Sequence, residues 1–201
     1  MFHVQGISKS YHRRPVLQQV DFFLPAGQCL GVTGENGSGK STLLSILAQT
    51  NTPDSGDIIF QGKSVLGDRH FLRRQLGYVP QGCDLIPDLT CRQQLQLWLN
   101  ACGVKEPVPE DVAGMLGLEE LMDVRISEMS GGMQRRVSIA LALSTRPGIL
   151  IMDEATTGLD AQYREKLLNW LEDYLRRGGR LVWCSHLPEE NRRLCGTTLP
   201  L

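Results

Sequence analysis

The segment at residues 34–41 constrains this chain more than any other, because it reads Gly-Glu-Asn-Gly-Ser-Gly-Lys-Ser. It follows an apolar run, residues 29–33, and it opens a helical pattern that begins Ser-Thr-Leu-Leu at residue 41. A GxxxxGK[ST] pattern between a strand and a helix is the signature of a phosphate-binding loop. Its glycines let backbone N–H groups converge on phosphate oxygens, and the helix N-terminus adds partial positive charge. The segment therefore predicts a site for the phosphates of a nucleotide.

The polar side chains of this loop have separate expected tasks. Lys40 is expected to place a positive charge on the β- and γ-phosphate oxygens, and the Ser41 hydroxyl to ligate Mg²⁺. Thr42 is expected to reach the phosphates as well. The predicted nucleotide-binding set of the loop is Gly34, Glu35, Asn36, Gly37, Ser38, Gly39, Lys40, Ser41 and Thr42. The alternative is a chance Gly-rich turn, and the strand and helix on either side of the loop argue against it.

A second feature is the acidic pair Asp153 and Glu154, directly after the apolar run at residues 149–152. In open α/β sheets, ligands bind outside the carboxyl ends of the strands, so both side chains would face the nucleotide. We predict that Asp153 holds Mg²⁺ and that Glu154 polarises the water that attacks the γ-phosphate. An acidic pair often marks only the end of a strand, and the phosphate loop upstream favours the functional interpretation.

Composition narrows the class of protein. The chain has 201 residues, 41% of them hydrophobic and 21% charged, with a formal net charge of −1. These values are ordinary for a globular domain and provide no overall basic field for nucleic acid. No apolar run approaches the ~20 residues of a membrane span, and the first residues show no signal-peptide pattern. The six cysteines form no CxxC pair, so we expect reduced thiols in a cytoplasmic protein.

The distribution of strand and helix patterns indicates an α/β fold in a single domain, residues 1–201. Strand patterns are expected at residues 2–7, 20–24, 29–33, 57–60, 76–79, 149–152 and 181–184. Helical patterns begin at residue 41 and cover residues 134–144 and about 161–177. Residues 83–130 carry helical patterns and few strand signals. We therefore expect a core of about residues 1–82 and 131–201, with a small helical subdomain at about 83–130.

The segment Ser130-Gly131-Gly132-Met133-Gln134-Arg-Arg lies between the two phosphate-site motifs. Alone, it would be a helix N-cap followed by two glycines. In combination with the motifs around it, it resembles the signature motif of the ATP-binding subunits of ABC (ATP-binding cassette) transporters. The resemblance covers nearly the whole chain, and the motifs occur in the order that the family has.

The resemblance implies roles for further residues. Tyr11 would stack on adenine, Gln81 would be the Q-loop glutamine, Asp160 would end the D-loop at residues 157–160, and His186 would be the switch histidine. Each has a simpler alternative. Tyr11 would then be a surface aromatic, Gln81 an ordinary loop residue, Asp160 a helix cap, and His186 a structural histidine.

The same resemblance implies a fold and a mechanism. The fold would be a P-loop NTPase (RecA-like) core with a mixed sheet, an antiparallel β subdomain and a small helical subdomain. Residues 130–134 would face the γ-phosphate of ATP held by a second subunit, so that two ATP molecules join a dimer. The implied catalytic set is Glu154, His186, Gln81 and Lys40. The implied Mg²⁺ ligands are Ser41, Gln81 and Asp153.

The implied partners are a separate transmembrane permease and a second ATP-binding subunit, identical or different, without nucleic acid. The expected location is the cytoplasmic face of the cell membrane, where the permease would hold the subunit. The chain would hydrolyse ATP to power transport. Four departures qualify this interpretation. Met133 replaces a common Gln, a style that resembles ABC-2 exporters and favours export. Ala155 replaces a common Pro, Gln93 replaces an acid, and after a helix near residues 189–195 we expect none of the family's following strands.

Other classes are less compatible with these motifs. A soluble ABC-type ATPase of nucleic-acid repair or translation would usually carry coiled-coil inserts or two cassettes in one chain. A P-loop kinase would leave residues 130–134 and His186 unexplained. A nucleotide-binding regulator without turnover would not need Lys40, Asp153 and Glu154 together. A neighbouring reading frame that encodes about six apolar spans would discriminate the transporter from these alternatives.

Overall fold

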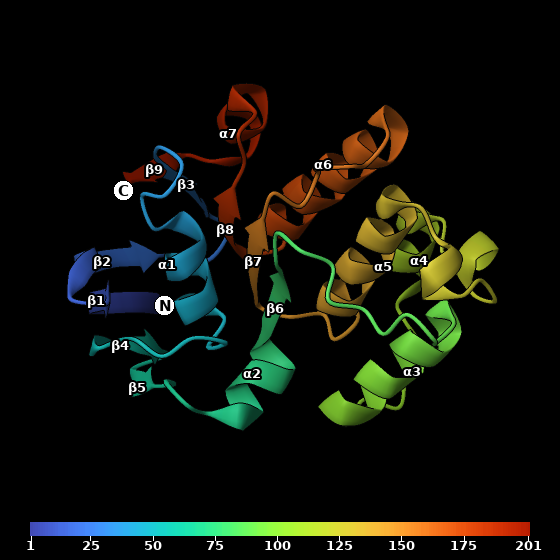
Figure 1. Cartoon of the computed structure of the whole chain (residues 1–201), viewed down its shortest axis with the longest axis horizontal. Helices are drawn as coiled ribbons and strands as arrows, with labels where there is room; N and C mark the ends of the chain where they lie inside the picture. Colours follow the sequence, from blue (N-terminus) through green and yellow to red (C-terminus); the bar gives the residue numbers. More distant parts are fainter.

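A five-stranded sheet carries the phosphate loop in the computed structural model, which describes residues 1–201 (Figure 1). The strand order is β6-β7-β8-β3-β9, and every pairing is parallel. The strands are β6 (Leu76–Val79), β7 (Ile149–Asp153), β8 (Arg180–Cys184), β3 (Cys29–Thr33) and β9 (Thr197–Pro200). Parallel strands need crossover connections, and the intervening helices supply them.

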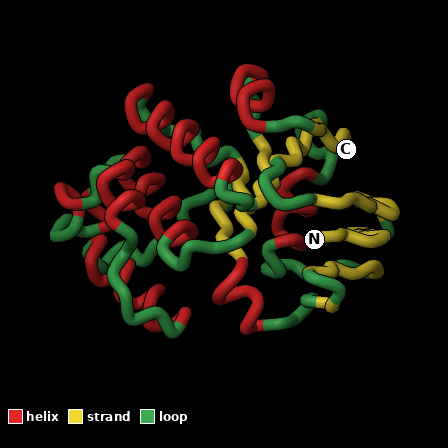
Figure 2. Tube along the Cα trace, turned by 180° about the vertical axis from the view of Figure 1, so that it is seen from behind, coloured by secondary structure: helices red, strands yellow, loops and turns green.

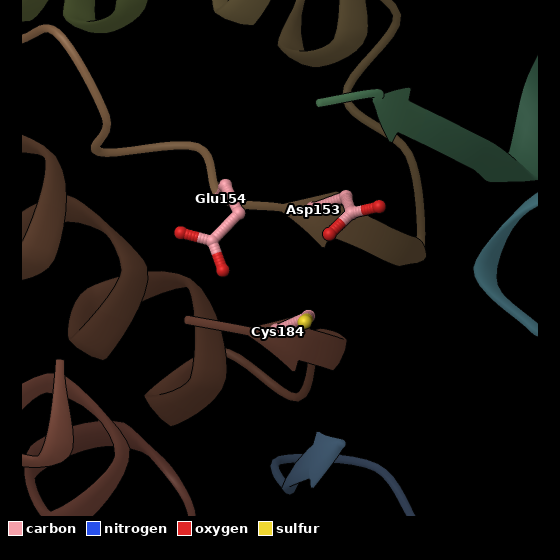
Figure 3. Close-up of side chains that lie close together, drawn as sticks. All are labelled: Asp153, Glu154 and Cys184. Carbon is pink, nitrogen blue, oxygen red and sulfur yellow. The ribbon is translucent and has the colours of Figure 1, made fainter. Parts of the chain in front are cut away.

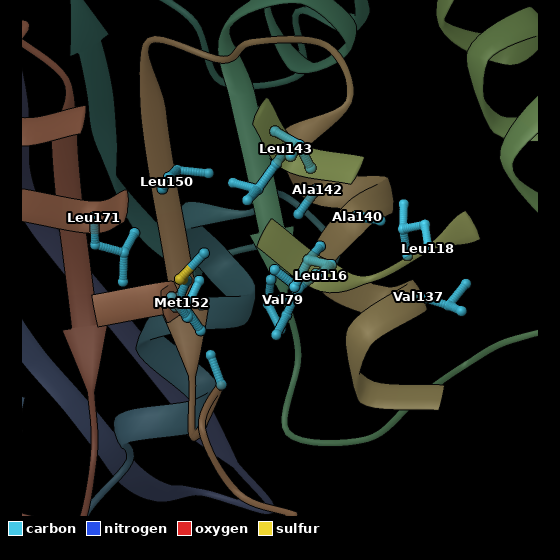
Figure 4. Packing of buried hydrophobic residues seen from close by; sticks show 14 of the residues in the cluster. Val79, Leu116, Leu118, Val137, Ala140, Ala142, Leu143, Leu150, Met152 and Leu171 are labelled. Atoms are coloured by element: carbon cyan, nitrogen blue, oxygen red, sulfur yellow. The ribbon is translucent and has the colours of Figure 1, made fainter. Parts of the chain in front are cut away.

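Strand β7 belongs to two hydrophobic clusters, one on each face of this sheet. Ile149 and Ile151 pack in the cluster that contains the apolar residues of α1 (Lys40–Leu47). Leu150 and Met152 pack in the cluster formed with α5 (Gly131–Leu143) and α6 (Ala161–Arg176) (Figure 4). All five residues of β7 are buried. Burial on both faces explains why this strand is an unbroken apolar run rather than an alternating pattern.

A second, antiparallel sheet covers α1 on the side away from β7. Its order is β2-β1-β4-β5, with β1 (Phe2–Tyr11), β2 (Arg14–Leu24), β4 (Ser55–Phe60) and β5 (Lys63–Ser64). Gly56 shows why a glycine stands at the start of β4. Its φ is +98°, and a Cβ there would lie 2.5 Å from the Gln5 carbonyl oxygen. Only glycine fits this approach of β4 to β1.

The helical segment lies at the opposite end of the molecule from the antiparallel sheet, with the parallel sheet between them (Figure 2). It contains α3 (Cys91–Cys102), α4 (Glu110–Leu116) and the short 3₁₀ turns Glu119–Leu121 and Ile126–Glu128. Thr90 and Gln93 form a reciprocal capping box at the start of α3. Gln93 therefore replaces the expected acid without loss of the cap, because an amide oxygen also accepts the backbone N–H.

The α/β class and the separate antiparallel sheet are confirmed. The core sheet itself is parallel throughout, where the resemblance implied a mixed one. The expectation that no strand follows the last helix, α7 (Pro188–Leu194), is wrong, because β9 pairs with β3. Helix α2 (Arg69–Gln75) was not expected, and α5 begins at Gly131 rather than at Gln134. No helix in this structure is both long and apolar enough to cross a bilayer.

Candidate functional site

The carboxyl ends of β3, β7 and β8 border one cavity of about 340 Å³. Its walls come from the phosphate loop, the acidic pair, the loops after β6 and β8, and one residue of β2. The lining residues are Val16, Asn36, Gly37, Gly39, Lys40, Ser41, Thr42, Gln81, Asp153, Glu154, Cys184 and His186. The fold therefore brings residues that are up to 170 positions apart in the sequence, Val16 and His186, to one site.

The phosphate loop has the local structure that its glycines predict. Gly39 precedes α1 with a φ of +105°, and a Cβ there would lie 2.9 Å from a methyl group of Val16. Lys40 Nζ donates hydrogen bonds to the carbonyl oxygens of Gly34 and Glu35, at 2.9 and 2.8 Å. These two hydrogen bonds hold the lysine side chain against the phosphate loop. Gly34, Glu35 and Ser38 belong to this loop but do not line the cavity.

The acidic pair is buried at the end of β7. Asp153 is 2% exposed and Glu154 is 7% exposed. Asp153 Oδ2 and Glu154 Oε1 are buried without a hydrogen-bond partner. His186 Nε2 lies 3.2 Å from Glu154 Oε1, without the alignment of a hydrogen bond. Buried carboxylate oxygens are costly when they are unpaired, so these atoms are suited to a ligand in the cavity.

Glu154 also has an unusual backbone. Its φ is +53°, in the left-handed region that side chains other than glycine rarely adopt. Its N–H donates to the Cys184 carbonyl oxygen at 2.9 Å, and the Thr157 hydroxyl donates to Glu154 Oε2 at 3.3 Å. These contacts hold the strained residue in place. Backbone strain of this kind concentrates at functional sites.

Cys184 completes a close group with the two carboxylates (Figure 3). One ligand atom from each of Asp153, Glu154 and Cys184 lies within 4.8 Å of the others. Burial, reinforced by the two nearby carboxylates, raises the pKa of the Cys184 thiol to about 12. The donors that face the same cavity from Ser41, Gln81 and Asp153 are oxygens, which are the ligands that Mg²⁺ prefers. The residues present therefore fit Mg²⁺.

The loop that carries Gln81 is held by a residue that sequence reasoning missed. Arg135, on α5, is 5% exposed. Its guanidinium donates to the carbonyl oxygens of Pro80, at 2.6 Å, and of Gln81. The arginine follows the segment 130–134 directly, so it connects that segment to the loop of Gln81. Its position beside the predicted motif was the only available signal in the sequence.

Residues of the segment 130–134 line a different cavity, of about 350 Å³, together with the D-loop. The Ser130 hydroxyl accepts a hydrogen bond from the Met133 N–H at 3.3 Å and caps α5. Asp160 likewise caps α6 by accepting from the Tyr163 N–H at 3.0 Å. A Cβ at Gly132 would lie 2.6 Å from the Gly158 carbonyl oxygen. The two motifs are packed against each other, and neither lines the cavity of the phosphate loop.

The other two predicted residues of this segment differ from each other. Gln134, on α5, turns back toward the residues that precede this helix and donates to the carbonyl oxygens of Ile126 and Met129, at 3.0 and 3.3 Å. Gly131 has open space where a side chain would stand. Ser130 and Gly131 are exposed. The exposed start of α5 is thus free of side-chain obstruction.

Tyr11 is not among the residues that line the cavity of the phosphate loop. Its side chain is exposed, and its hydroxyl accepts a hydrogen bond from Asn51 Nδ2 at 2.7 Å. Val16, from β2, lines the cavity instead, and no sequence motif indicated it. The role of Tyr11 against adenine stays a prediction.

Comparisons with known proteins agree with this geometry. Residues 17–157 match the family model described as ABC transporter. The chain is 38% identical over 194 residues to the Nod factor export ATP-binding protein I of Paraburkholderia xenovorans, covering 94% of this chain and 64% of that protein. The protein of the same name from Ralstonia nicotianae is 36% identical, with 96% of this chain and 61% of that protein covered. The chain therefore spans less than two thirds of the length of these curated relatives.

Solved structures give the same result. The ATP-binding subunit of an ABC transporter superimposes with a TM-score of 0.91 and 26% identity, covering 100% of this chain and 85% of that one. A dimeric ATP-binding cassette bound to ADP and phosphate superimposes with a TM-score of 0.89 and 25% identity, covering 100% and 94%. The fold and its cavity define a P-loop nucleotide-binding domain. The chain belongs to the ABC transporter family, as an ATP-binding cassette.

Proposed function

We propose that this chain binds and hydrolyses ATP as the motor subunit of an ABC exporter whose membrane permease is a separate protein. The observation that carries the proposal is the single cavity that gathers the phosphate loop, Gln81, Asp153, Glu154 and His186. The names of the relatives, which describe export ATP-binding proteins, support the direction of transport.

In this function the phosphate loop would hold the triphosphate. Backbone N–H groups of the loop and the Lys40 ammonium group would balance its negative charge, because α1 starts at the loop. Ser41, Gln81 and Asp153 would hold Mg²⁺, which would neutralise charge that develops on the phosphates. Tyr11 would move over adenine only if the ring turned from Asn51 toward the cavity.

The chemical step would use Glu154 and His186. The attacking water would give its proton to the Glu154 carboxylate while its oxygen bonds to the γ-phosphorus and the bond to ADP breaks. His186 would contact the γ-phosphate and orient that water, because its imidazole is already beside the same carboxylate. Hydrogen bonds to Cys184 and from Thr157 hold Glu154 in its left-handed backbone conformation, which suits a base that must keep its position.

Dimerisation would complete the site. The start of α5 at Ser130 and Gly131 is exposed, and Ser130 lines a cavity that is separate from that of the phosphate loop. We infer that it meets the γ-phosphate held by a second ATP-binding subunit, identical or different, with Asp160 at the same interface. Within this surface only Ser130 belongs to the helical subdomain of about residues 83–130. The permease would hold the pair of subunits at the cytoplasmic face of the membrane.

The experiment is a phosphate-release assay on the purified chain with ATP and Mg²⁺, alone and with a membrane protein of about six apolar spans from a neighbouring reading frame. We expect turnover that requires Mg²⁺, and co-purification of the two proteins. Lys40→Ala provides the matched inactive control, while Lys105→Ala removes a lysine that does not line the cavity of the phosphate loop. An absence of turnover in both settings would refute the hydrolytic role, and turnover without any permease association would refute the transport role.

A further inference from the structure

Glu190, on α7, is the one fully buried carboxylate of the chain, with no exposed side-chain surface. It accepts hydrogen bonds from three other elements. The Ser185 hydroxyl donates to its Oε2 at 2.6 Å, and the Thr156 hydroxyl donates to the same oxygen at 3.1 Å. Arg164 Nε donates to its Oε1 at 2.8 Å. A buried charge needs this degree of pairing, because an unpaired carboxylate would be strongly destabilising.

The two hydroxyl groups belong to the loops that contain Glu154 and His186. Thr156 follows Glu154 by two residues, after β7, and Ser185 directly precedes His186, after β8. One carboxylate oxygen therefore joins the segment of the expected base to the segment of the expected switch histidine. Ser185 is fixed further, because its hydroxyl accepts from the Leu187 N–H at 3.1 Å.

The guanidinium of Arg164 connects the same carboxylate to α6. This arginine lies in the first turns of α6, shortly after Asp160, and also pairs with Glu189 at 2.8 Å. The surroundings of Glu190 thus reach both ends of the D-loop as well as the switch loop. None of these contacts involves a residue that lines the cavity of the phosphate loop.

We propose that Glu190 is a positioning residue for ATP hydrolysis: it fixes the separation of Glu154 and His186 by holding Thr156 and Ser185 on one oxygen. The proposal rests on the proposed function. Catalysis depends steeply on such geometry, and misplacement of a catalytic group by about 1 Å can cost roughly a hundredfold in rate. Binding of ATP to the phosphate loop needs no part of this network.

The competing explanation is that Glu190 only packs α7 against α6. The structure supplies a matched control for that explanation. Arg193, also on α7, pairs with Glu172 of α6 at 2.7 Å, on a more exposed part of the same helix contact. This ion pair joins the two helices without touching either loop. Glu172→Gln therefore weakens the helix contact alone, whereas Glu190→Gln disturbs the loops as well.

The test compares Glu190→Gln, Thr156→Val, Ser185→Ala and Glu172→Gln in the chain of 201 residues. An amide brings N–H donors to a point where the carboxylate only accepts, and it leaves Arg164 without its buried counter-charge. Thr156→Val removes only the hydrogen bond to Glu190 Oε2, whereas Ser185→Ala also removes the acceptor of the Leu187 N–H; both substitutions change the side-chain volume little. We expect Glu190→Gln to lower kcat by roughly ten- to a hundredfold, with KM for ATP and nucleotide affinity within about twofold. Glu172→Gln should retain the wild-type kcat.

A double variant separates the network from general destabilisation. If Thr156 acts through Glu190, then Thr156→Val combined with Glu190→Gln should lose no more activity than Glu190→Gln alone. Should Glu190→Gln fail to fold, the two hydroxyl variants carry the test, and each is expected to lower kcat without raising KM. Wild-type kcat in all three network variants, or an equal loss in Glu172→Gln, would overturn the proposal.

A second readout does not depend on turnover. The chain has four histidines, so the imidazole NMR signal of His186 can be assigned by its loss in His186→Ala. We expect this signal to shift in Glu190→Gln and to stay in place in Glu172→Gln. If the wild-type protein hydrolyses no ATP, the proposed function fails, while the imidazole signal still reports whether Glu190 positions His186. An unshifted signal in Glu190→Gln would refute the positioning role.

Discussion

Replacement of Glu154 by glutamine should separate hydrolysis from binding. The amide keeps the shape of the side chain, and the left-handed φ of +53° strains glutamate and glutamine alike because neither is branched at Cβ. The amide cannot accept the proton of the attacking water. Loss of a general base costs about 10²–10⁴-fold in rate, which corresponds to about 3–5 kcal/mol of barrier height at 1.36 kcal/mol per factor of ten.

The same substitution should have little effect on folding. The nearest basic nitrogen to the Glu154 carboxylate is His186 Nε2 at 3.2 Å, and that histidine side chain is 57% exposed. Water screens an interaction with so exposed a partner, so its loss should cost little stability. The Thr157 hydroxyl can still donate to the amide oxygen. A large loss of thermal stability in Glu154→Gln would therefore show that the acid has a structural role.

Two measurements check this prediction. Phosphate release under saturating ATP and Mg²⁺ should fall by the stated factor, while titration with a fluorescent ATP analogue should give the wild-type affinity. Size-exclusion chromatography with light scattering should show an ATP-bound dimer that persists in the variant. Glu119→Gln, an exposed acid of the helical segment, is the matched control and should behave as wild type. Wild-type turnover in Glu154→Gln would remove this residue from the role of base.

Three further predictions concern other site residues. Lys40→Ala should weaken ATP binding as well as stop turnover, because it removes the only lysine or arginine side chain that lines the cavity, and an unchanged affinity for a fluorescent analogue would contradict this. His186→Ala should spare binding and lower kcat, whereas an equal loss of ATP and ADP affinity in titrations would indicate a structural histidine. Met133→Gln should change turnover by less than about tenfold, since Met133 packs against the core. Ser130→Arg should abolish the ATP-driven dimerisation seen by light scattering, and it also removes a helix cap worth about 1 kcal/mol. An inactive Met133→Gln variant together with an active Ser130→Arg variant would refute these different roles.

The parts of the fold that the sequence could predict are those whose buried residues form a pattern within one segment. Strand β7 and strand β3 were predicted within one residue, because each is a short, mostly apolar run beside a polar motif. Helix α6 was also predicted, since Leu167, Leu168 and Leu171 recur on one face. In these segments local composition and tertiary burial give the same answer.

The parts that were missed lack this agreement. Helix α2 has four charged or imidazole side chains in its seven residues and buries only Phe71, so it shows no apolar stripe. Strand β9 is mostly exposed and ends in a proline, and only its pairing with β3 defines it. A strand that depends on backbone partners far away in the sequence leaves little trace in its own residues.

Some residues of the candidate site could likewise be predicted from the sequence, and others could not. Motif spacing predicted Lys40, Asp153 and His186, which the structure brings to one cavity. Val16 and Glu190 carry no motif. Val16 enters the cavity only because β2 passes over the phosphate loop, and Glu190 matters only because three separate elements converge on it. Such roles come from tertiary contacts, which a single sequence does not display.

Because β7 contributes residues to two hydrophobic clusters, the unfolding of one cluster should be coupled to the unfolding of the other. The alternate residues of β7 anchor separate cores, so neither core can melt without releasing the strand that ends in the acidic pair. We expect a form that keeps only one of the two cores to lose activity, because local opening follows units that share buried contacts. Loss of packing on either face of the sheet would therefore displace the same two carboxylates. On heating, activity and folded structure should be lost at the same temperature.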